Sequence, residues 1–166
     1  PSRSRTSVLY EFSLDSGLQE RYRNPMNEIR IEKLLEDLDA LAATISYKHC
    51  SSSDGSARSL TLVTACVENL ILKKPITIET DLTIEGVVTW VGSSSMEIQL
   101  DVKQSTPETT NSTEVVSLVA NFTFVARDKT GKSAKVNPIL PENEKEILLW
   151  QEAEERSKKR KKKKEN

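Results

Sequence analysis

The sequence predicts an α+β fold, in which a largely antiparallel sheet packs against one long amphipathic helix. Residues 28–49 carry apolar side chains at helical spacing, and the segments on either side of them are mostly strand-like. Two of those segments, residues 82–91 and 95–104, are joined by a short Gly-Ser-Ser connection, which is typical of a β-hairpin. One early helix among strand-like segments gives the order β–α–β–β–β–β.

The individual elements follow from the spacing of apolar residues and from the loop-forming residues between them. In residues 95–104, every second residue from 96 to 102 is apolar, which predicts one buried and one solvated face. We expect strands at residues 6–14, 60–69, 82–91, 95–104 and 115–127, loops at residues 15–29, 51–56 and 105–113, and a second helix at residues 142–156.

The chain of 166 residues is long enough for one domain with a buried core. Its formal net charge of −1 hides a strong asymmetry. Residues 156–164 contain eight Lys or Arg and no acid, whereas residues 1–155 contain 16 Lys or Arg against 24 Asp or Glu, which leaves about −8. Because the body is acidic, we expect no folded nucleic-acid-binding surface.

This asymmetry divides the chain into three parts. We expect a disordered end at residues 1–6, a folded domain at residues 7–137, and a charged helix with a basic tail at residues 138–166. Two interpretations of the tail remain open. It is a solvated linker or end, or it attracts a polyanion such as nucleic acid or an anionic membrane.

Cysteine usage indicates a reducing compartment. Cys50 and Cys66 lie 16 residues apart in apolar sequence, and His49 is the single histidine of the chain. This spacing fits no metal-binding motif, so we expect two reduced, structural thiols and no metal site. No apolar run approaches the roughly 20 residues that a membrane-spanning helix needs.

The predicted helix carries three carboxylates beside an apolar stripe. At 100° per residue from Leu38, Asp37 and Asp39 lie about 100° to either side of the stripe, and Glu36 points away from it. Spacing alone does not choose between the aspartates, which are either solvated edge residues or candidates for a general base or nucleophile. The stripe consists of Ile31, Leu34, Leu35, Leu38, Leu41, Ala42 and Ile45.

The start of this helix is a second candidate site. Unpaired backbone N–H groups there, near Ile31 and Glu32, can stabilise a developing oxyanion together with the helix dipole. Just upstream, Asn24, Asn27 and Arg30 are able to hydrogen-bond a carbonyl or a phosphate. Helix capping is the alternative, and for Asn27 it is the favoured one.

Several segments, taken in order, resemble a hotdog-fold acyl-CoA thioesterase. The similarity is to the N-terminal domain of the mitochondrial, brown-fat-type enzymes, which carry two hotdog domains, and to their plant relatives. It covers about residues 7–155. The segments are IRIEKLLEDLDALAATISYKHC, LTLVTACVENLILKKPI, VTWVGSSSMEIQLDV and FTFVARDKTGKSAKVNPILP, followed by a charged helix that joins the two domains in that family.

The resemblance implies a function and roles for individual residues. The hotdog fold wraps an antiparallel sheet around a central helix, and the implied reaction converts fatty acyl-CoA to free acid and coenzyme A. Matching the helix motif implies that Asp39 is the catalytic base or nucleophile, that Asn24 positions the substrate, and that Asp37 packs or forms a salt bridge. No metal or cofactor is expected, because coenzyme A is part of the substrate.

The family also implies a partner and a location. Active sites in this fold form between paired domains, so we expect a second hotdog domain, from a homodimer or from a C-terminal half of a longer protein. The location implied is mitochondrial or another organelle.

The substrate-binding residues expected are Ile31 and Glu32 at the helix start, Lys74 for coenzyme A phosphate, and Ser93 and Ser94 in the hairpin. Glu32 stands where the family usually has Gly, and Ser93 stands where it commonly has Arg. These two departures keep a second interpretation open, in which the chain is a non-catalytic acyl-CoA-binding or dimerisation module. Lys73 and Arg127 are further basic residues that a phosphate would attract.

Overall fold

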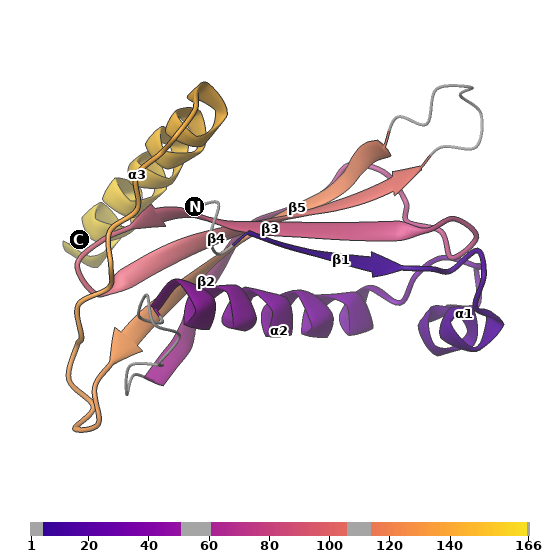
Figure 1. Cartoon of the computed structure of the whole chain (residues 1–166), viewed down its shortest axis with the longest axis horizontal. Coiled ribbons are helices and arrows are strands. Elements are labelled where there is room, and N and C mark those ends of the chain that lie inside the picture. Colours follow the sequence, from indigo (N-terminus) through magenta and orange to yellow (C-terminus); the bar gives the residue numbers. More distant parts are fainter. Residues whose placement is uncertain (1–4, 51–60, 106–113, 166) are drawn as a thin grey trace.

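The computed structural model describes residues 5–50, 61–105 and 114–165. Within them the chain forms strands and helices in the order β–α–α–β–β–β–β–α (Figure 1). The predicted end at residues 1–6 and the predicted loops at 51–56 and 105–113 lie wholly or mostly outside the described residues. The elements are β1 (Thr6–Tyr10), α1 (Ser16–Tyr22), α2 (Ile31–Cys50), β2 (Thr61–Leu72), β3 (Leu82–Val91), β4 (Ser95–Ser105), β5 (Glu114–Arg127) and α3 (Glu144–Glu165).

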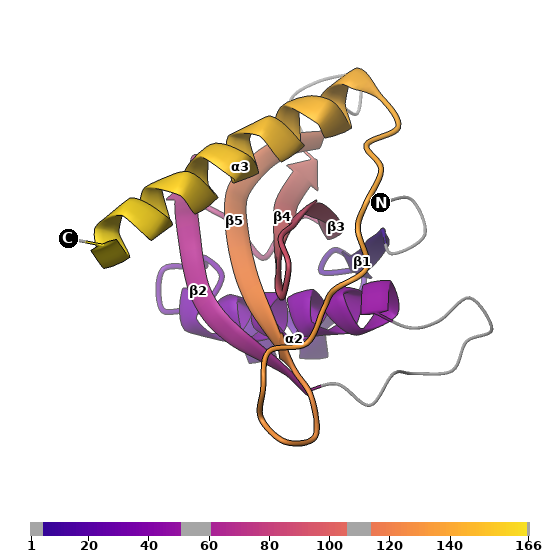
Figure 2. The same ribbon diagram turned by 90° about the vertical axis from the view of Figure 1, so that its left-hand side faces the viewer.

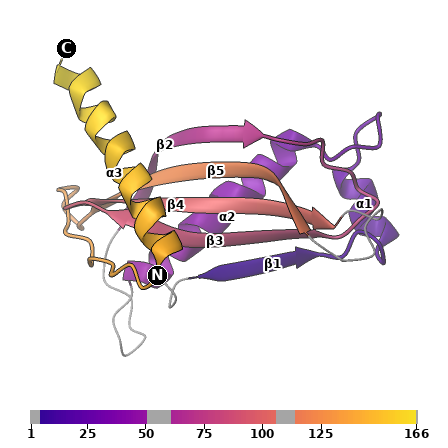
Figure 3. The same cartoon turned by 90° about the horizontal axis from the view of Figure 1, so that it is seen from above.

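The five strands form one antiparallel sheet in the order β1-β3-β4-β5-β2. Helix α2 lies along one face of the sheet, and α3 crosses the other face near one end (Figures 1 and 3). The predicted α+β class and the β3–β4 hairpin are therefore confirmed. Strands β1 and β2 form the two edges of this sheet, which leaves each with one side unpaired among the described residues.

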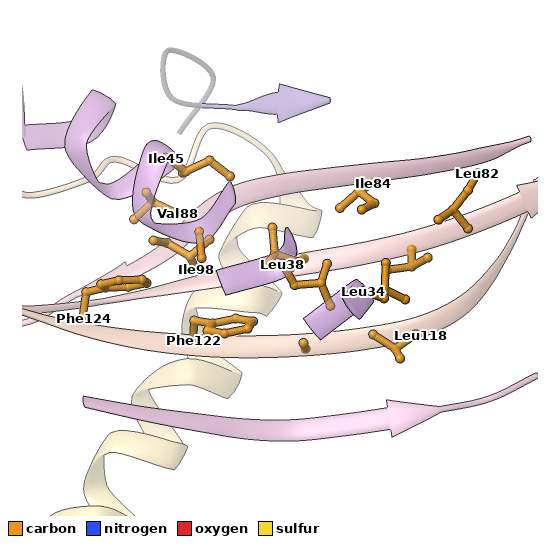
Figure 4. Packing of buried hydrophobic residues seen from close by; sticks show 14 of the residues in the cluster. Leu34, Leu38, Ile45, Leu82, Ile84, Val88, Ile98, Leu118, Phe122 and Phe124 are labelled. Atoms are coloured by element: carbon orange, nitrogen blue, oxygen red, sulfur yellow. The ribbon is translucent and has the colours of Figure 1, made fainter. Parts of the chain in front are cut away.

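Helix α2 is held on the sheet by the apolar stripe that the sequence predicts. Leu34, Leu38, Ala42 and Ile45 are fully buried, while Ile31, Leu35 and Leu41 pack at the margins. Figure 4 shows Leu34, Leu38 and Ile45 against side chains from β3, β4 and β5. Burying one such aliphatic side chain contributes about 1.5–3 kcal/mol, so this stripe is the main attachment of the helix.

Helix α2 packs closely on the sheet at Gly86 in β3. A Cβ atom at this position would lie 2.3 Å from Ile45 Cδ1 and 2.4 Å from Leu100 Cδ2. Both neighbours are fully buried, so neither side chain can swing out to make room. Glycine is therefore required here for packing rather than for backbone conformation.

We expect Gly86→Ala to lower the free energy of unfolding by about 1–3 kcal/mol, because it overpacks the core. Urea unfolding followed by circular dichroism measures the loss. Gly17→Ala in α1 is the matched control, since its added methyl group meets only Asp15 Oδ1 at 3.4 Å. Equal midpoints for the two variants would show that α2 shifts freely on the sheet.

The first corrections concern residues 6–29. Strand β1 ends at Tyr10 rather than at residue 14, and the predicted loop 15–29 contains the helix α1. Asp15 caps this helix, because its Oδ1 accepts a hydrogen bond from the Leu18 backbone N–H at 3.0 Å. The rings of Phe12 and Tyr22, 5.6 Å apart, bury the short helix against the core. A seven-residue helix depends on such tertiary contacts, so apolar spacing did not predict it.

The second correction concerns the C-terminal segment. Residues 142–156 were expected to form a helix followed by a tail, but α3 continues through the basic residues to Glu165. Figure 2 shows α3 crossing the sheet and extending beyond β2. The helix also covers part of the face of β4 that was expected to be solvated. Glu97 lies on that face and is fully buried.

Candidate active site

Asp39 lies on the side of α2 that faces the edge strand β2. Its side chain is exposed, and its Oδ1 accepts a hydrogen bond from Thr64 Oγ1 at 3.1 Å. Thr64 was not among the residues predicted from sequence. Its place in an otherwise ordinary strand pattern gave no signal, because the contact spans 25 residues of chain. The bond orients the carboxylate while leaving the residue open to solvent.

Asp37 lies on the opposite shoulder and has a different environment. Its Oδ2 accepts hydrogen bonds from Tyr10 Oη, at 2.8 Å, and from Tyr22 Oη. Burial, reinforced by the neighbouring carboxylate, raises the pKa of Tyr22 to about 12 and that of Tyr10 further still. Both hydroxyls therefore stay protonated and keep donating at neutral pH. This arrangement supports the packing role expected for Asp37, since it ties β1 and α1 to α2.

A cavity of about 220 Å³ lies at the start of α2. It brings together four of the predicted site residues, Asn24, Arg30, Ile31 and Glu32. Leu72 and Ile76, which sequence analysis did not single out, supply apolar walls from the far end of β2 and the segment after it. The full lining is Asn24, Glu28, Ile29, Arg30, Ile31, Glu32, Leu72, Pro75 and Ile76.

Asn24 is fixed in the loop by its own side chain. Its Oδ1 accepts hydrogen bonds from the backbone N–H groups of Met26 and Glu28, both at 2.9 Å. The loop also places Asn27 at a φ of 61°, a left-handed conformation that Asn tolerates. Because the carbonyl oxygen of Asn24 is committed to the loop, its amide nitrogen is the atom that can donate to a substrate.

Glu32 is exposed at the mouth of this cavity. Its own backbone N–H, and then the Arg30 guanidinium at 3.2 Å, lower the pKa of the carboxyl group. The carboxylate therefore carries its negative charge beside backbone N–H groups that were predicted to stabilise an oxyanion. This charge opposes a developing oxyanion there, which is the physical consequence of having Glu rather than Gly at this position.

The other predicted binding residues are not assembled with these within one chain. Lys74 is exposed and precedes Pro75, so it lies beside the cavity without lining it. Ser93 and Ser94 lie in the β3–β4 connection, at the opposite end of the sheet from the start of α2 (Figure 1). There their carbonyl oxygens accept hydrogen bonds from the backbone N–H groups of Val136 and Ala126.

Two other basic residues also do not line the cavity. Arg127 donates to the carbonyl oxygen of Gly131 at 3.1 Å, within its own turn. Lys73 is exposed and lies between Leu72 and Pro75, which do line the cavity.

His49 lies at the far end of α2, where its Nε2 is 2.7 Å from the carbonyl oxygen of Asn137. Burial lowers the pKa of this imidazole. The histidine therefore anchors the end of the helix.

Within one chain, Asp39 lies far from the cavity at the start of α2. Asp39 lies eight residues after Ile31 in α2, which is about 12 Å along the helix. A general base and an oxyanion donor both have to lie about 3 Å from one reacting group. Asp39 and the cavity of the same chain therefore cannot act on one carbonyl group.

The cysteines agree with the sequence prediction, and metal ligands do not cluster in the part of the chain that the structure describes. Cys50 is buried, Cys66 is half-buried, and both are free thiols. Among the described residues, no three His, Cys, Asp or Glu side chains are grouped as a metal site would require. Within the same residues, no helix is long and apolar enough to span a membrane.

Comparison with known proteins identifies the family. The chain is 64% identical over 162 residues to a Humulus lupulus protein named acyl-coenzyme A thioesterase 4, mitochondrial, and covers 31% of it. A second Humulus lupulus protein, named acyl-coenzyme A thioesterase 2, chloroplastic, is 60% identical over 164 residues, and the chain covers 38% of its length. The chain thus spans about a third of the length of these curated relatives. No family model matches.

Shorter proteins match over most of their length. A Bacillus subtilis protein named as an uncharacterized acyl-CoA thioester hydrolase is 33% identical over 132 residues, which are 80% of this chain and 71% of that protein. The crystal structure of an apo-hexameric acyl-CoA thioesterase superposes with a TM-score of 0.79 at 28% identity, covering 98% of this chain and 94% of the other. The sheet, the central helix and these matches together show that the chain belongs to the hotdog-fold acyl-CoA thioesterase family.

Proposed function

We propose that this chain is a hotdog domain that hydrolyses fatty acyl-CoA to free fatty acid and coenzyme A, with Asp39 as general base or nucleophile. The observation that carries the proposal is the contrast between the two helix aspartates. Asp37 is bound by two tyrosine hydroxyls, whereas Asp39 is exposed and oriented by Thr64. A carboxylate oriented in this way at an open edge is suited to act on a bound substrate.

The second part of the proposal is a partner hotdog domain at the β2 edge. This edge strand carries large apolar side chains that are 45–51% exposed, and an exposed apolar edge strand invites pairing with another strand. Two-fold pairing there would place Asp39 of each domain near the Asn24 cavity of the other. The exposed apolar residues are Val63, Val67, Leu70, Ile71 and Leu72.

The proposed reaction needs only groups that the chain supplies. Asp39 takes a proton from a water molecule as the water oxygen bonds to the thioester carbonyl carbon, while the Asn24 amide and backbone N–H groups at the start of α2 stabilise the oxyanion. The carbon–sulfur bond then breaks and the proton passes to the coenzyme A sulfur. In the nucleophilic route, the Asp39 oxygen attacks first and water releases the acid from the anhydride.

A location in an organelle is part of the same proposal. Its support is that the two Humulus lupulus relatives are named mitochondrial and chloroplastic. Two free cysteines are compatible with a reducing compartment, such as the mitochondrial matrix. The domain limits at residues 7–137 and the absence of a cofactor requirement remain predictions.

A complementation experiment tests the shared site. Asp39→Asn and Asn24→Ala are purified separately and then mixed under conditions that allow subunit exchange. Each variant alone is expected to be nearly inactive. Half of the mixed dimers combine both variants and have one intact site of two, so activity should recover to about 25% of wild type. Coenzyme A release from acyl-CoAs of increasing chain length, detected with a thiol reagent, is the measurement.

The same measurement distinguishes the proposed thioesterase from the non-catalytic binding module. Glu32 favours the binding module, because its carboxylate lies at the helix start. A wild-type chain that is folded and binds acyl-CoA but never releases coenzyme A would support the binding module. A mixture no more active than its components, from an active wild type, would contradict a site shared between domains.

A further inference from the structure

The outer face of α3 combines exposed lysines with exposed aliphatic residues. Ala153 is fully buried against the sheet and marks the inner side of the helix. At 100° per residue, eight exposed side chains lie within about 60° of the opposite direction. They are the aliphatic Ile147 and Leu148, the basic Lys158, Lys159 and Lys162, the polar Gln151, and the acidic Glu144 and Glu155.

The two arginines of the basic segment point the other way. Arg156 Nε donates to Glu97 Oε1 at 2.7 Å, and an Arg160 guanidinium nitrogen lies 2.9 Å from Glu68 Oε1. These ion pairs fix the rotation of α3 on the sheet. The lysines are therefore held outward by the same contacts that hold the arginines inward, and they form a fixed surface.

This surface extends beyond the acidic body. The C-terminal part of α3 passes β2 and projects from the sheet (Figures 2 and 3). Exposed Lys161 and Lys163 flank the outer face near this end. A cationic segment that projects away from a body carrying about −8 approaches an anionic surface before the body repels it.

We propose that the outer face of α3 docks on an anionic phospholipid bilayer. The lysines contact headgroup phosphates, while Ile147 and Leu148 enter the interface about 15–20 Å further along the helix. The aliphatic residues favour a lipid over a nucleic acid, since a nucleic-acid backbone offers nothing to bury them. Glu144 and Glu155 lie on the same face and oppose the contact, although Glu155 is paired with Lys158 at 3.7 Å.

The test is co-sedimentation of the full 166-residue chain with vesicles. Phosphatidylcholine vesicles with about 30 mol% phosphatidylserine are compared with pure phosphatidylcholine, at about 50 mM and about 500 mM salt. We expect binding to the anionic vesicles at low salt only. Lys158→Gln/Lys159→Gln/Lys162→Gln should weaken it about a hundredfold, since each lysine contributes about fivefold.

The matched control removes three exposed lysines from the turn after β5, as Lys129→Gln/Lys132→Gln/Lys135→Gln. It changes the net charge equally but should bind vesicles like the wild type. A second variant, Ile147→Ser/Leu148→Ser, should weaken vesicle binding while leaving the lysines in place.

Three results would overturn the proposal. The first is that the control variant loses vesicle binding as strongly as the Lys158→Gln/Lys159→Gln/Lys162→Gln variant. The second is that the serine variant binds vesicles like the wild type and that the wild type binds duplex DNA as tightly as vesicles, which would mean that α3 binds any polyanion. The third is that the lysine variant changes from a dimer to a higher oligomer without lipid, which would mean that the outer face of α3 contacts another copy of the chain.

Discussion

Asp39→Asn is expected to reduce coenzyme A release by about 10²- to 10⁴-fold, the usual loss when a general base is removed. Asparagine keeps the size of the side chain and still accepts the hydrogen bond from Thr64, which is 3.1 Å away in the native protein. It no longer takes a proton from water, nor does it act as a nucleophile. Stability should change little, because Asp39 is exposed.

Glu36→Gln is the matched control for this variant. It makes the same carboxylate-to-amide change three residues earlier in α2, at a position that is also exposed. It should retain wild-type turnover. An Asp39→Asn protein that is as active as Glu36→Gln would exclude Asp39 from the reaction, whatever the oligomeric state.

Arg156→Met is expected to lower the free energy of unfolding by about 3–5 kcal/mol at neutral pH. Glu97 is fully buried and its Oε1 is bound to Arg156 Nε at 2.7 Å, so the substitution leaves a buried carboxylate without its counter-charge. Within the described residues, Glu97 Oε2 already has no hydrogen-bond partner. Lys158→Met is the matched control and should cost less than about 1 kcal/mol, because the ion pair that Lys158 forms with Glu155 is exposed.

Two further measurements separate lost charge pairing from lost packing in the Arg156 variant. Burial raises the pKa of Glu97, although Arg156 opposes the shift. A raised pKa in the folded state favours the protonated, folded form, so the stability deficit should shrink as the pH falls towards the ordinary range for Glu, near 4.3. The double variant Arg156→Met/Glu97→Gln should recover part of the loss. If the loss of stability neither shrinks at low pH nor is reduced by Glu97→Gln, the loss comes from packing of the Arg156 side chain and not from its charge.

The sequence determined the parts of the fold that depend on local periodicity. The stripe around Leu38 predicted which face of α2 is buried, and the alternation in β4 predicted the buried side of that strand. Both follow from repeats of about 3.6 and two residues, which are visible in a single chain. The boundaries of α2 were accurate to about three residues for the same reason.

The failures all involve contacts between distant parts of the chain. Helix α1 forms because Tyr22 packs on Phe12 and bonds to Asp37, and α3 extends through a lysine-rich segment that Arg156 and Arg160 anchor to the sheet. Such partners are brought together only by the fold. The candidate site was partly predictable, since Asn24, Ile31 and Glu32 do share a cavity, but Thr64 and the distance of Ser93 from that cavity were not.

The pairing of Glu97 with Arg156 also determines when the sheet can complete its folding during synthesis of the chain. All five strands have been made once Arg127 is added, yet the counter-charge for Glu97 is added only 29 residues after that strand ends. Until Arg156 leaves the ribosome, the nascent sheet has to keep this carboxylate hydrated on an open face. Docking of α3 is therefore the step that dehydrates β4, and the strands reach their native environment only after the basic helix has emerged.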